Sequence, residues 1–273
     1  MMLRNYILFV FIICFINFGF VQAQSDNDSV SIANITENSI ATTENEAQAA
    51  YINKNFSESI KLYEAQVAEN KQINQESAEL YYNLGNAYFR DNQVAKAIVN
   101  YERALLLKPG DSDIRHNLRF AKTRIEDKID SADNFFVNKW IRSIQNIYSA
   151  NTWAIIGIVF FVLFIVAVGL YMISSRMLLR KISFYVGIVL FFMVLITNTF
   201  AFKQKQKIVN RSTAIVMSAS VSIYTSPDAH SQELFRLHQG AKVRIKREEG
   251  RWVEIVIANG SVGWLQKNNV EVI

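Results

Sequence analysis

The chain contains 273 residues, 51% of them hydrophobic, and its 29 Lys and Arg exceed its 24 Asp and Glu. Once its long apolar segments are set aside, this length leaves room for about two domains of modest size. Its one cysteine, Cys14, lies in an N-terminal apolar run. Downstream of that run the chain therefore has no thiol for a disulfide, a thiolate metal site or a cysteine nucleophile.

The N-terminal apolar run covers residues 6–21 and follows a basic residue. It leads into a small-x-small pattern that ends at Ala23, after which the chain is polar. We therefore predict a signal peptide over residues 1–23, so that the rest of the chain starts outside the cytoplasm. The alternative is an anchor helix that is not cleaved. Residues 24–43 are polar and show no sustained period, which predicts a flexible linker.

A domain of helical repeats is predicted over residues 44–128. The 34 residues from Ala78 to Asp111 place small and large side chains where a helix-turn-helix of the tetratricopeptide type requires them. Gly85 would let the second helix approach the first closely, and Pro109 would end the second helix. The packed faces should comprise Tyr81, Leu84, Gly85 and Tyr88 on the first helix and Ala97, Tyr101 and Ala104 on the second.

Incomplete repeats flank this unit. Residues 112–127 look like the first helix of a further repeat that lacks its second helix. A looser repeat would begin near Ile40, with Ser59 and Gln66 where small alanines are usual. About two and a half repeats bury barely enough apolar surface to be stable alone, since at least three are usually needed. We therefore expect a partner to stabilise the stack.

Stacked repeat helices form a concave groove that holds a peptide or a partner helix. Polar side chains on the predicted helices could donate hydrogen bonds to a carboxylate or to the backbone of such a ligand. The candidates are Asn83, Asn86, Arg90 and Asn117. The alternative for each of them is simple solvation on the outer side of a helix.

Residues 135–149 are predicted to form an amphipathic helix. Apolar side chains recur at helical spacing and polar ones take the other side: Phe136, Trp140, Ile144 and Ile147 against Lys139, Arg142 and Gln145. A helix with Trp and basic residues just before a membrane span suits the bilayer interface. The alternative is a capping helix that packs on the repeats.

Two apolar runs, residues 152–173 and 182–202, are each long enough to cross a bilayer. Neither contains Asp, Glu, Lys, Arg or His, so neither offers the charge of an ion path or proton relay. The segment between them, residues 174–181, is basic and is predicted to be a cytoplasmic hairpin. Two spans return the chain to the side from which it entered. Both flanking domains should therefore lie in the periplasm, with the chain anchored in the bacterial inner membrane.

The tail, residues 208–273, changes to the period of β-strands. Short runs rich in Val, Ile, Tyr and Trp alternate with turn residues, which predicts about five strands in a small barrel. Glycines at the turns and a Gly-Trp pair at Gly263 are similar to bacterial SH3-like domains, with Val243, Val253 and Ile255 filling the barrel. A groove on this barrel could be lined by Tyr224, Trp252 and Trp264. The alternative for both tryptophans is a partly buried place in the core.

The sequence contains no recognisable catalytic or metal-binding motif. His116, His230 and His238 are far apart, and none has a neighbour at ligand spacing. There is no Gly-rich phosphate loop, no His-Glu-x-x-His and no Gly-x-Ser-x-Gly. We therefore expect no enzyme activity, no catalytic residue, no metal and no cofactor.

The basic excess lies in the tail, because residues 203–273 hold 11 Lys and Arg against 6 Asp and Glu. A location outside the cytoplasm excludes nucleic acid as its partner. Anionic lipid or an acidic partner suits this charge.

The order of these parts resembles the BatE-type proteins of the Bat (Bacteroides aerotolerance) family. The string SIYTSPDAHSQELFRLHQGAKV and the later GSVGWL carry the resemblance in the tail. It implies a membrane protein without enzyme activity that works beside other Bat proteins, some with von Willebrand A-type domains, in aerotolerance or envelope stress. It supplies no catalytic residue.

The fold expected is therefore a multidomain membrane protein with all-α tetratricopeptide-like repeats, two transmembrane helices and a small all-β SH3-like barrel. Its expected function is that of a scaffold that binds partner proteins through the repeats and the barrel. The alternative is a cell-wall sensor or tether whose barrel binds peptidoglycan.

Overall fold

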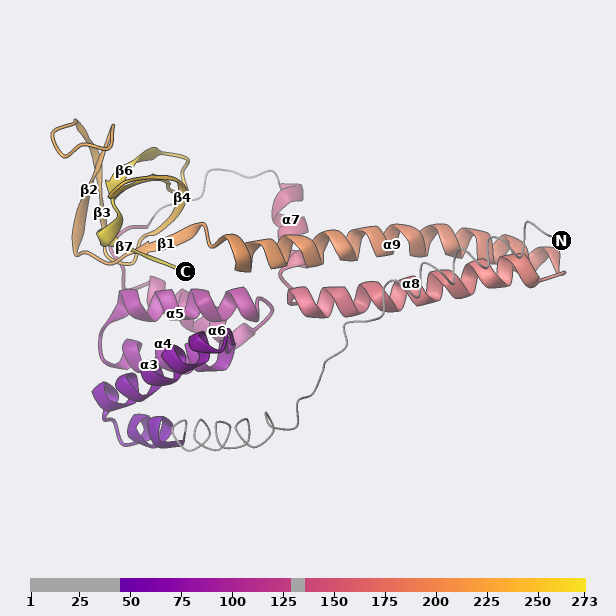
Figure 1. The fold of residues 1–273 in the computed structure, drawn as a ribbon, viewed down its shortest axis with the longest axis horizontal. Coiled ribbons are helices and arrows are strands. Elements are labelled where there is room, and N and C mark those ends of the chain that lie inside the picture. Colours follow the sequence, from indigo (N-terminus) through magenta and orange to yellow (C-terminus); the bar gives the residue numbers. More distant parts are fainter. Residues whose placement is uncertain (1–44, 129–135) are drawn as a thin grey trace. The chain divides into compact units, whose positions relative to one another are not determined.

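The computed structural model describes residues 45–128 and 136–273. The predicted signal peptide (1–23) and linker (24–43) lie outside the described residues. In the described part the chain is helical up to Asn210 and β-structured from Thr213 (Figure 1). The predicted fold class is confirmed: helical repeats, two helices apolar enough to cross a membrane, and an antiparallel sheet that fits an SH3-like domain.

The repeats consist of consecutive helices that each pack on the next. Residues 45–52 are helical, and the helices that follow are α3 (Phe56–Gln72), α4 (Ala78–Arg90), α5 (Val94–Leu107) and α6 (Ser112–Lys122). Side-chain caps fix two of the starts, because the Ser77 hydroxyl accepts the Leu80 N–H and the Asp111 carboxylate accepts the Ile114 N–H.

The predicted packing faces of α4 and α5 are buried. A Cβ on Gly85 would lie 2.8 Å from the Tyr101 ring, which confirms the close approach of these two helices. The looser first repeat is also present in part, since Ser59 and Gln66 are buried at the positions of the small alanines. The Ser59 hydroxyl donates to the carbonyl of Ala47, 2.9 Å away.

Helix α6 is shorter than predicted, because it ends at Lys122 instead of continuing to residue 127. The Thr123 hydroxyl donates to the Phe120 carbonyl, and the turn tightens to i→i+3 bonds. The residues that leave the helix contact the β domain, where Asp127 binds His238 and Ile125 lies against Gly240. This long-range contact replaces the last turn of the expected helix.

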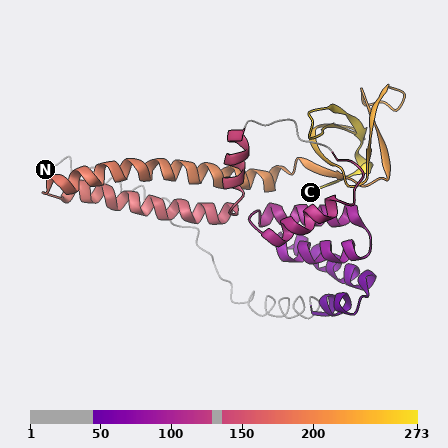
Figure 2. The same cartoon turned by 180° about the vertical axis from the view of Figure 1, so that it is seen from behind.

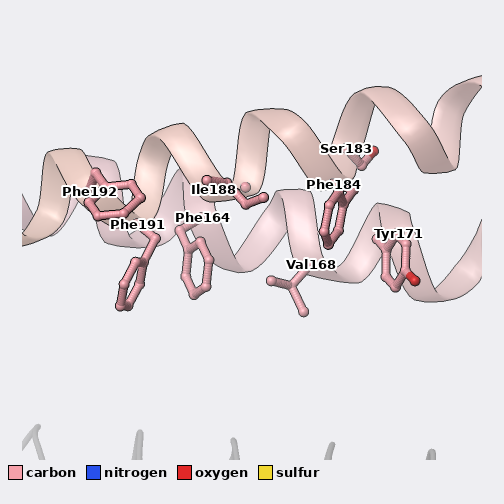
Figure 3. A pocket seen from close by; sticks show the side chains of 9 residues that line it. Phe164, Val168, Tyr171, Ser183, Phe184, Ile188, Phe191 and Phe192 are labelled. Carbon is pink, nitrogen blue, oxygen red and sulfur yellow. The ribbon is translucent and has the colours of Figure 1, made fainter.

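Three helices lead to and form the apolar pair: α7 (Phe136–Gln145), α8 (Ala150–Ile173) and α9 (Met177–Asn210). α8 and α9 run side by side in both views (Figures 1 and 2). The groove between them has a volume of about 340 Å³ and is lined by Phe, Val and Ile side chains, with one tyrosine and one serine (Figure 3).

Helix α9 extends past two of the predicted boundaries. The hairpin expected over 174–181 is reduced to residues 174–176, because the helix-favouring residues from Met177 onward join α9. α9 also continues past residue 202 to Asn210 and takes the first residues of the domain predicted from 208. Its last turns alternate Lys and Gln, which are good helix formers, and Arg211 in the left-handed region ends it.

The amphipathic helix expected over 135–149 is α7 with a turn after it. Trp140 is 66% exposed, so its ring can reach a bilayer interface. Gln145 differs from the expectation, because it is buried instead of solvated and its side chain donates to Gln204 of α9. The carbonyl of Gln145 also accepts the Trp153 indole N–H at 3.0 Å, so the end of α7 is bound to both apolar helices.

The β domain has seven strands in the order β3-β2-β6-β5-β4-β1-β7, and each strand is antiparallel to its neighbours. The strands are β1 (Thr213–Val216), β2 (Ser220–Tyr224), β3 (Glu233–His238), β4 (Lys242–Glu249), β5 (Trp252–Val256), β6 (Val262–Gln266) and β7 (Val270–Val272). This is more than the roughly five strands that the sequence predicts: residues 217–219 separate β1 from β2, and β7 is only three residues long. The predicted core residues Val243, Val253 and Ile255 are buried, and Gly240, Gly250 and Gly260 have positive φ at turns.

Candidate partner-binding surfaces

A hydrogen-bonded cluster joins α4, α5 and α6 on the repeats. The Asn86 carboxamide oxygen accepts the Tyr101 hydroxyl at 2.8 Å and the Asn117 amide at 2.9 Å. The same Asn117 nitrogen lies 3.1 Å from the Tyr82 hydroxyl. Asn86 and Asn117 are half-buried, so three helices hold both carboxamides in fixed positions at the surface.

This cluster leaves hydrogen-bonding capacity for a ligand. In the described part of the chain, the Asn86 amide nitrogen and the Asn117 carboxamide oxygen have no hydrogen-bond partner. One donor and one acceptor side by side match the acceptor and donor of a peptide backbone. We call the surface formed by Tyr82, Asn86 and Asn117, with the two aromatic residues described next, the repeat groove, after the groove that the sequence predicts for stacked repeats.

An apolar patch lies beside the carboxamides. The rings of Phe89 and Phe120 are 5.5 Å apart, and the Arg124 guanidinium lies within 6 Å of both centroids. Phe120 is 49% exposed, so about half of its surface is open to a ligand. The groove therefore offers paired amides and an aromatic surface to the same ligand.

The structure brings together only two of the four predicted groove residues, Asn86 and Asn117. Asn83 is half-buried on α4, and its side chain makes no hydrogen bond within the described residues. The Arg90 guanidinium lies 5.6 Å from the centre of the Phe56 ring of α3. The aromatic members were missed, although Tyr82, Asn86 and Phe89 follow the i, i+4, i+7 spacing of one helix stripe.

The β domain packs on α5, beside the core of the repeats. Ile215 and Ile273 are fully buried in the same apolar cluster as the repeat core. Arg103 of α5 forms an ion pair with Glu271 at 2.9 Å and donates to the carbonyl of Val272 at 2.8 Å. A later part of the same chain therefore covers α5.

A buried carboxylate holds the centre of this interface. Glu102 of α5 is 8% exposed and accepts the ammonium groups of Lys122 at 2.8 Å and Lys242 at 2.7 Å. Burial alone would raise the pKa of Glu102, but the two ammonium groups lower it below its ordinary value. The carboxylate is therefore ionised at neutral pH and links α6 to strand β4.

A histidine makes the second polar link of this interface. His238 Nδ1 lies 2.9 Å from an oxygen of Asp127, and the His238 backbone N–H donates to the other oxygen at 2.6 Å. The hydrogen bond to Asp127 raises the pKa of His238 above its ordinary value, and Glu126 adds to this while Arg236 opposes it. The link is thus stronger when the imidazole is protonated.

We expect the interface to loosen as the pH rises from 6 to 8.5. The pKa of His238 is higher in the folded protein than in the unfolded chain, where it is about 6.5. Protonation therefore stabilises the folded state fully below about pH 6.5, and this stabilisation is lost as the pH rises past the folded-state pKa. Glu102 does not contribute to this change, because a lowered pKa gives stability that is lost only in acid. Hydrogen exchange of the turn at Gly240 should therefore be faster at the higher pH after correction for intrinsic rates. His238→Gln should remove that difference and the exposed His230→Gln should keep it; a difference that persists in His238→Gln would contradict the assignment.

The barrel aromatics form a second surface, but not with all three predicted residues. Tyr224 and Trp252 meet edge to face with centroids 5.7 Å apart, and both are partly exposed. Trp264 is only 4% exposed, because the Arg247 guanidinium covers its ring at 4.8 Å. Arg247 also pairs with Glu254, which lies opposite Trp264 on the neighbouring strand. Trp264 therefore supports this face and contributes little surface to it.

Within residues 45–128 and 136–273, no three His, Cys, Asp or Glu side chains gather as metal ligands would. The arrangement of the groove and of the barrel face is suited to holding a ligand by hydrogen bonds and aromatic contact.

Comparison with known families agrees with this division of the chain. Residues 78–111 match the model of the tetratricopeptide repeat, the same 34 residues that the spacing selects. Residues 218–271 match the model of the bacterial SH3 domain, which covers most of the β domain. No curated protein matches the chain. Its two flanking domains are thus similar to families whose members bind proteins or cell-wall components.

Proposed function

We propose that this protein is a scaffold without enzyme activity, anchored in a bacterial inner membrane by α8 and α9. Its repeat groove binds a partner protein outside the cytoplasm. The observation that carries the proposal is the Asn86–Asn117 pair, which three helices hold in place with one free donor and one free acceptor. Such a pair recognises an extended peptide backbone, and the Phe89–Phe120 patch accepts an apolar side chain.

The contacts between the domains support a chain that crosses the membrane twice. Glu102 and Asp127 precede α8, whereas Lys242 and His238 follow α9. Their ion pairs require the repeats and the barrel to lie on the same side of any membrane. An even number of spans between the domains satisfies this requirement, and α8 and α9 provide two.

The helix pair itself is suited to anchoring. Only 17% of the most apolar stretch of α8 and 11% of that of α9 is buried, so most of the surface of both helices is left to contact lipid. The groove in Figure 3 offers a hydroxyl on Tyr171 and one on Ser183 among aromatic and aliphatic side chains. Neither is one of the charged side chains that usually mark an ion or proton pathway in a membrane.

The resemblance to BatE-type proteins suggests the partners. We propose that the groove binds Bat proteins with von Willebrand A-type domains, in a complex that serves aerotolerance or the response to envelope stress. The barrel, held on α5, would keep the short repeat stack folded while the groove is occupied.

Site-specific crosslinking in native membranes tests the groove. A photoreactive amino acid at Phe120 should capture one protein, which mass spectrometry identifies, whereas the same probe at the exposed Ile52 should not. Asn117→Asp should lower the yield roughly tenfold, because the carboxylate can no longer donate to Asn86 and misaligns the pair. Asn83→Asp makes the same chemical change on the same domain and should leave the yield unchanged.

Equal capture at Phe120 and Ile52, or a yield that Asn117→Asp does not change, would contradict a partner-binding groove on the repeats.

The Tyr224–Trp252 pair favours a second candidate, a tether that binds peptidoglycan through aromatic contact with its sugars. Sedimentation of the detergent-solubilised protein with sacculi, lost in Trp252→Ala and retained in Asn117→Asp, would favour this tether over the scaffold.

A further inference from the structure

A cationic pocket of about 570 Å³ lies where the end of the repeats, α7 and the barrel meet. Its charged lining residues are Lys122, Asp127, Arg142, Lys242 and Arg244. Four of these five are cations, and they come from three separate segments of the chain. The pocket thus has the charge that attracts an anion.

The charges of the pocket do not cancel. Asp127 is bound to His238, and Lys122 and Lys242 share the carboxylate of Glu102. Arg142 and Arg244 have neither an ion pair nor a side-chain hydrogen bond within residues 45–128 and 136–273. Their guanidinium groups remain available, and such planar forks bind phosphate oxygens in pairs.

The Arg142 side of the pocket lies next to the layer of lipid headgroups if α9 crosses the membrane as proposed. Lys207 of α9 donates to Asn146 at 3.0 Å, and the Asn146 N–H in turn donates to the carbonyl of Arg142. Lys207 lies five positions after Phe202, the last residue of the predicted span, which is about 7.5 Å along the helix. The headgroup layer is roughly 5–7 Å thick on each side of the hydrocarbon core. Arg142 therefore lies next to this layer.

We propose that this pocket binds the phosphate group of an anionic membrane lipid through Arg142 and Arg244. The apolar wall formed by Val256, Ile257 and Ala258 would contact the glycerol part of the lipid. Because one arginine belongs to α7 and the other to β4, the bound lipid holds the barrel and the interfacial helix on the membrane surface. This inference rests on the membrane anchoring proposed above.

The test is a lipid titration of the full-length protein in nonionic detergent, followed by native mass spectrometry. Phosphatidylglycerol should bind more tightly than phosphatidylcholine. Arg142→Gln with Arg244→Gln should weaken phosphatidylglycerol binding about 25-fold, since each Lys or Arg near an anionic surface changes affinity about fivefold. Arg119→Gln with Arg251→Gln removes the same charge from exposed positions outside the pocket and should leave the affinity unchanged.

The proposal would be overturned if the two double variants bound phosphatidylglycerol with the same affinity, whether that affinity is unchanged or equally weakened. Displacement of phosphatidylglycerol by millimolar inorganic phosphate would show that the pocket takes a free anion and not a lipid. Hydrogen exchange of β4 and α7 in each variant checks that the fold is intact. Extraction of the protein from vesicles by alkaline carbonate tests the anchoring separately, so failure of the anchor and failure of the lipid site give different results.

Discussion

Tyr101→Ala is expected to destabilise the repeats by about 3–5 kcal/mol, because it removes a large side chain from the centre of their core. Tyr101 is 1% exposed, and its ring fills the space that Gly85 leaves open on α4. The substitution also leaves Asn86 without the hydroxyl that it accepts at 2.8 Å. Hydrogen exchange of α4 and α5 in the full-length protein should accelerate by more than a hundredfold at this loss of free energy.

Tyr101→Phe is the matched control for this prediction. It keeps the ring against Gly85 and removes only the hydroxyl, so the expected loss is about 1 kcal/mol. Equal effects of the two substitutions would mean that the hydrogen bond and not the packing of the ring stabilises α4 on α5. An unchanged exchange rate in Tyr101→Ala would contradict the packing altogether.

The repeat unit and the apolar helices could be predicted because their determinants are local. In the repeat unit, small residues such as Gly85 and Ala97 recur at the spacing of helix contacts. In the apolar helices, about 20 consecutive apolar residues are enough to identify a segment that can span the hydrocarbon core of a bilayer. The same holds for the glycines of the barrel turns, since a positive φ depends on one residue.

The interface between the repeats and the barrel could not be predicted, because its partners are far apart in sequence. Glu102 and Lys242 are separated by 140 positions, and each alone is an ordinary charged residue. The length of α6 shares this cause, since Asp127 and Ile125 leave the helix for contacts on the barrel. The groove shows the same limit, because the sequence suggested Asn83 and Arg90 but not the exposed Phe120.

Glu102→Lys is expected to separate the barrel from the repeats. It would place a third cation between Lys122 and Lys242 at a position that is 8% exposed, where an unpaired charge costs several kcal/mol. Both lysines are more than a third exposed and can turn toward water, so we expect a net loss of about 3 kcal/mol rather than the full cost of a buried charge. Exchange of the β1 amides, which pack on α5, should rise roughly a hundredfold.

Glu79→Lys is the control, because it makes the same charge change at an exposed position of α4. Glu102→Gln should lie between the two, since the carboxamide keeps an acceptor for one ammonium group but not the charge. If the barrel is the partner that stabilises the short stack, α5 must lose protection together with β1 in Glu102→Lys. Loss at β1 with full protection of α5 would mean that the repeats are stable alone, and the role of the barrel would then be limited to its own binding face.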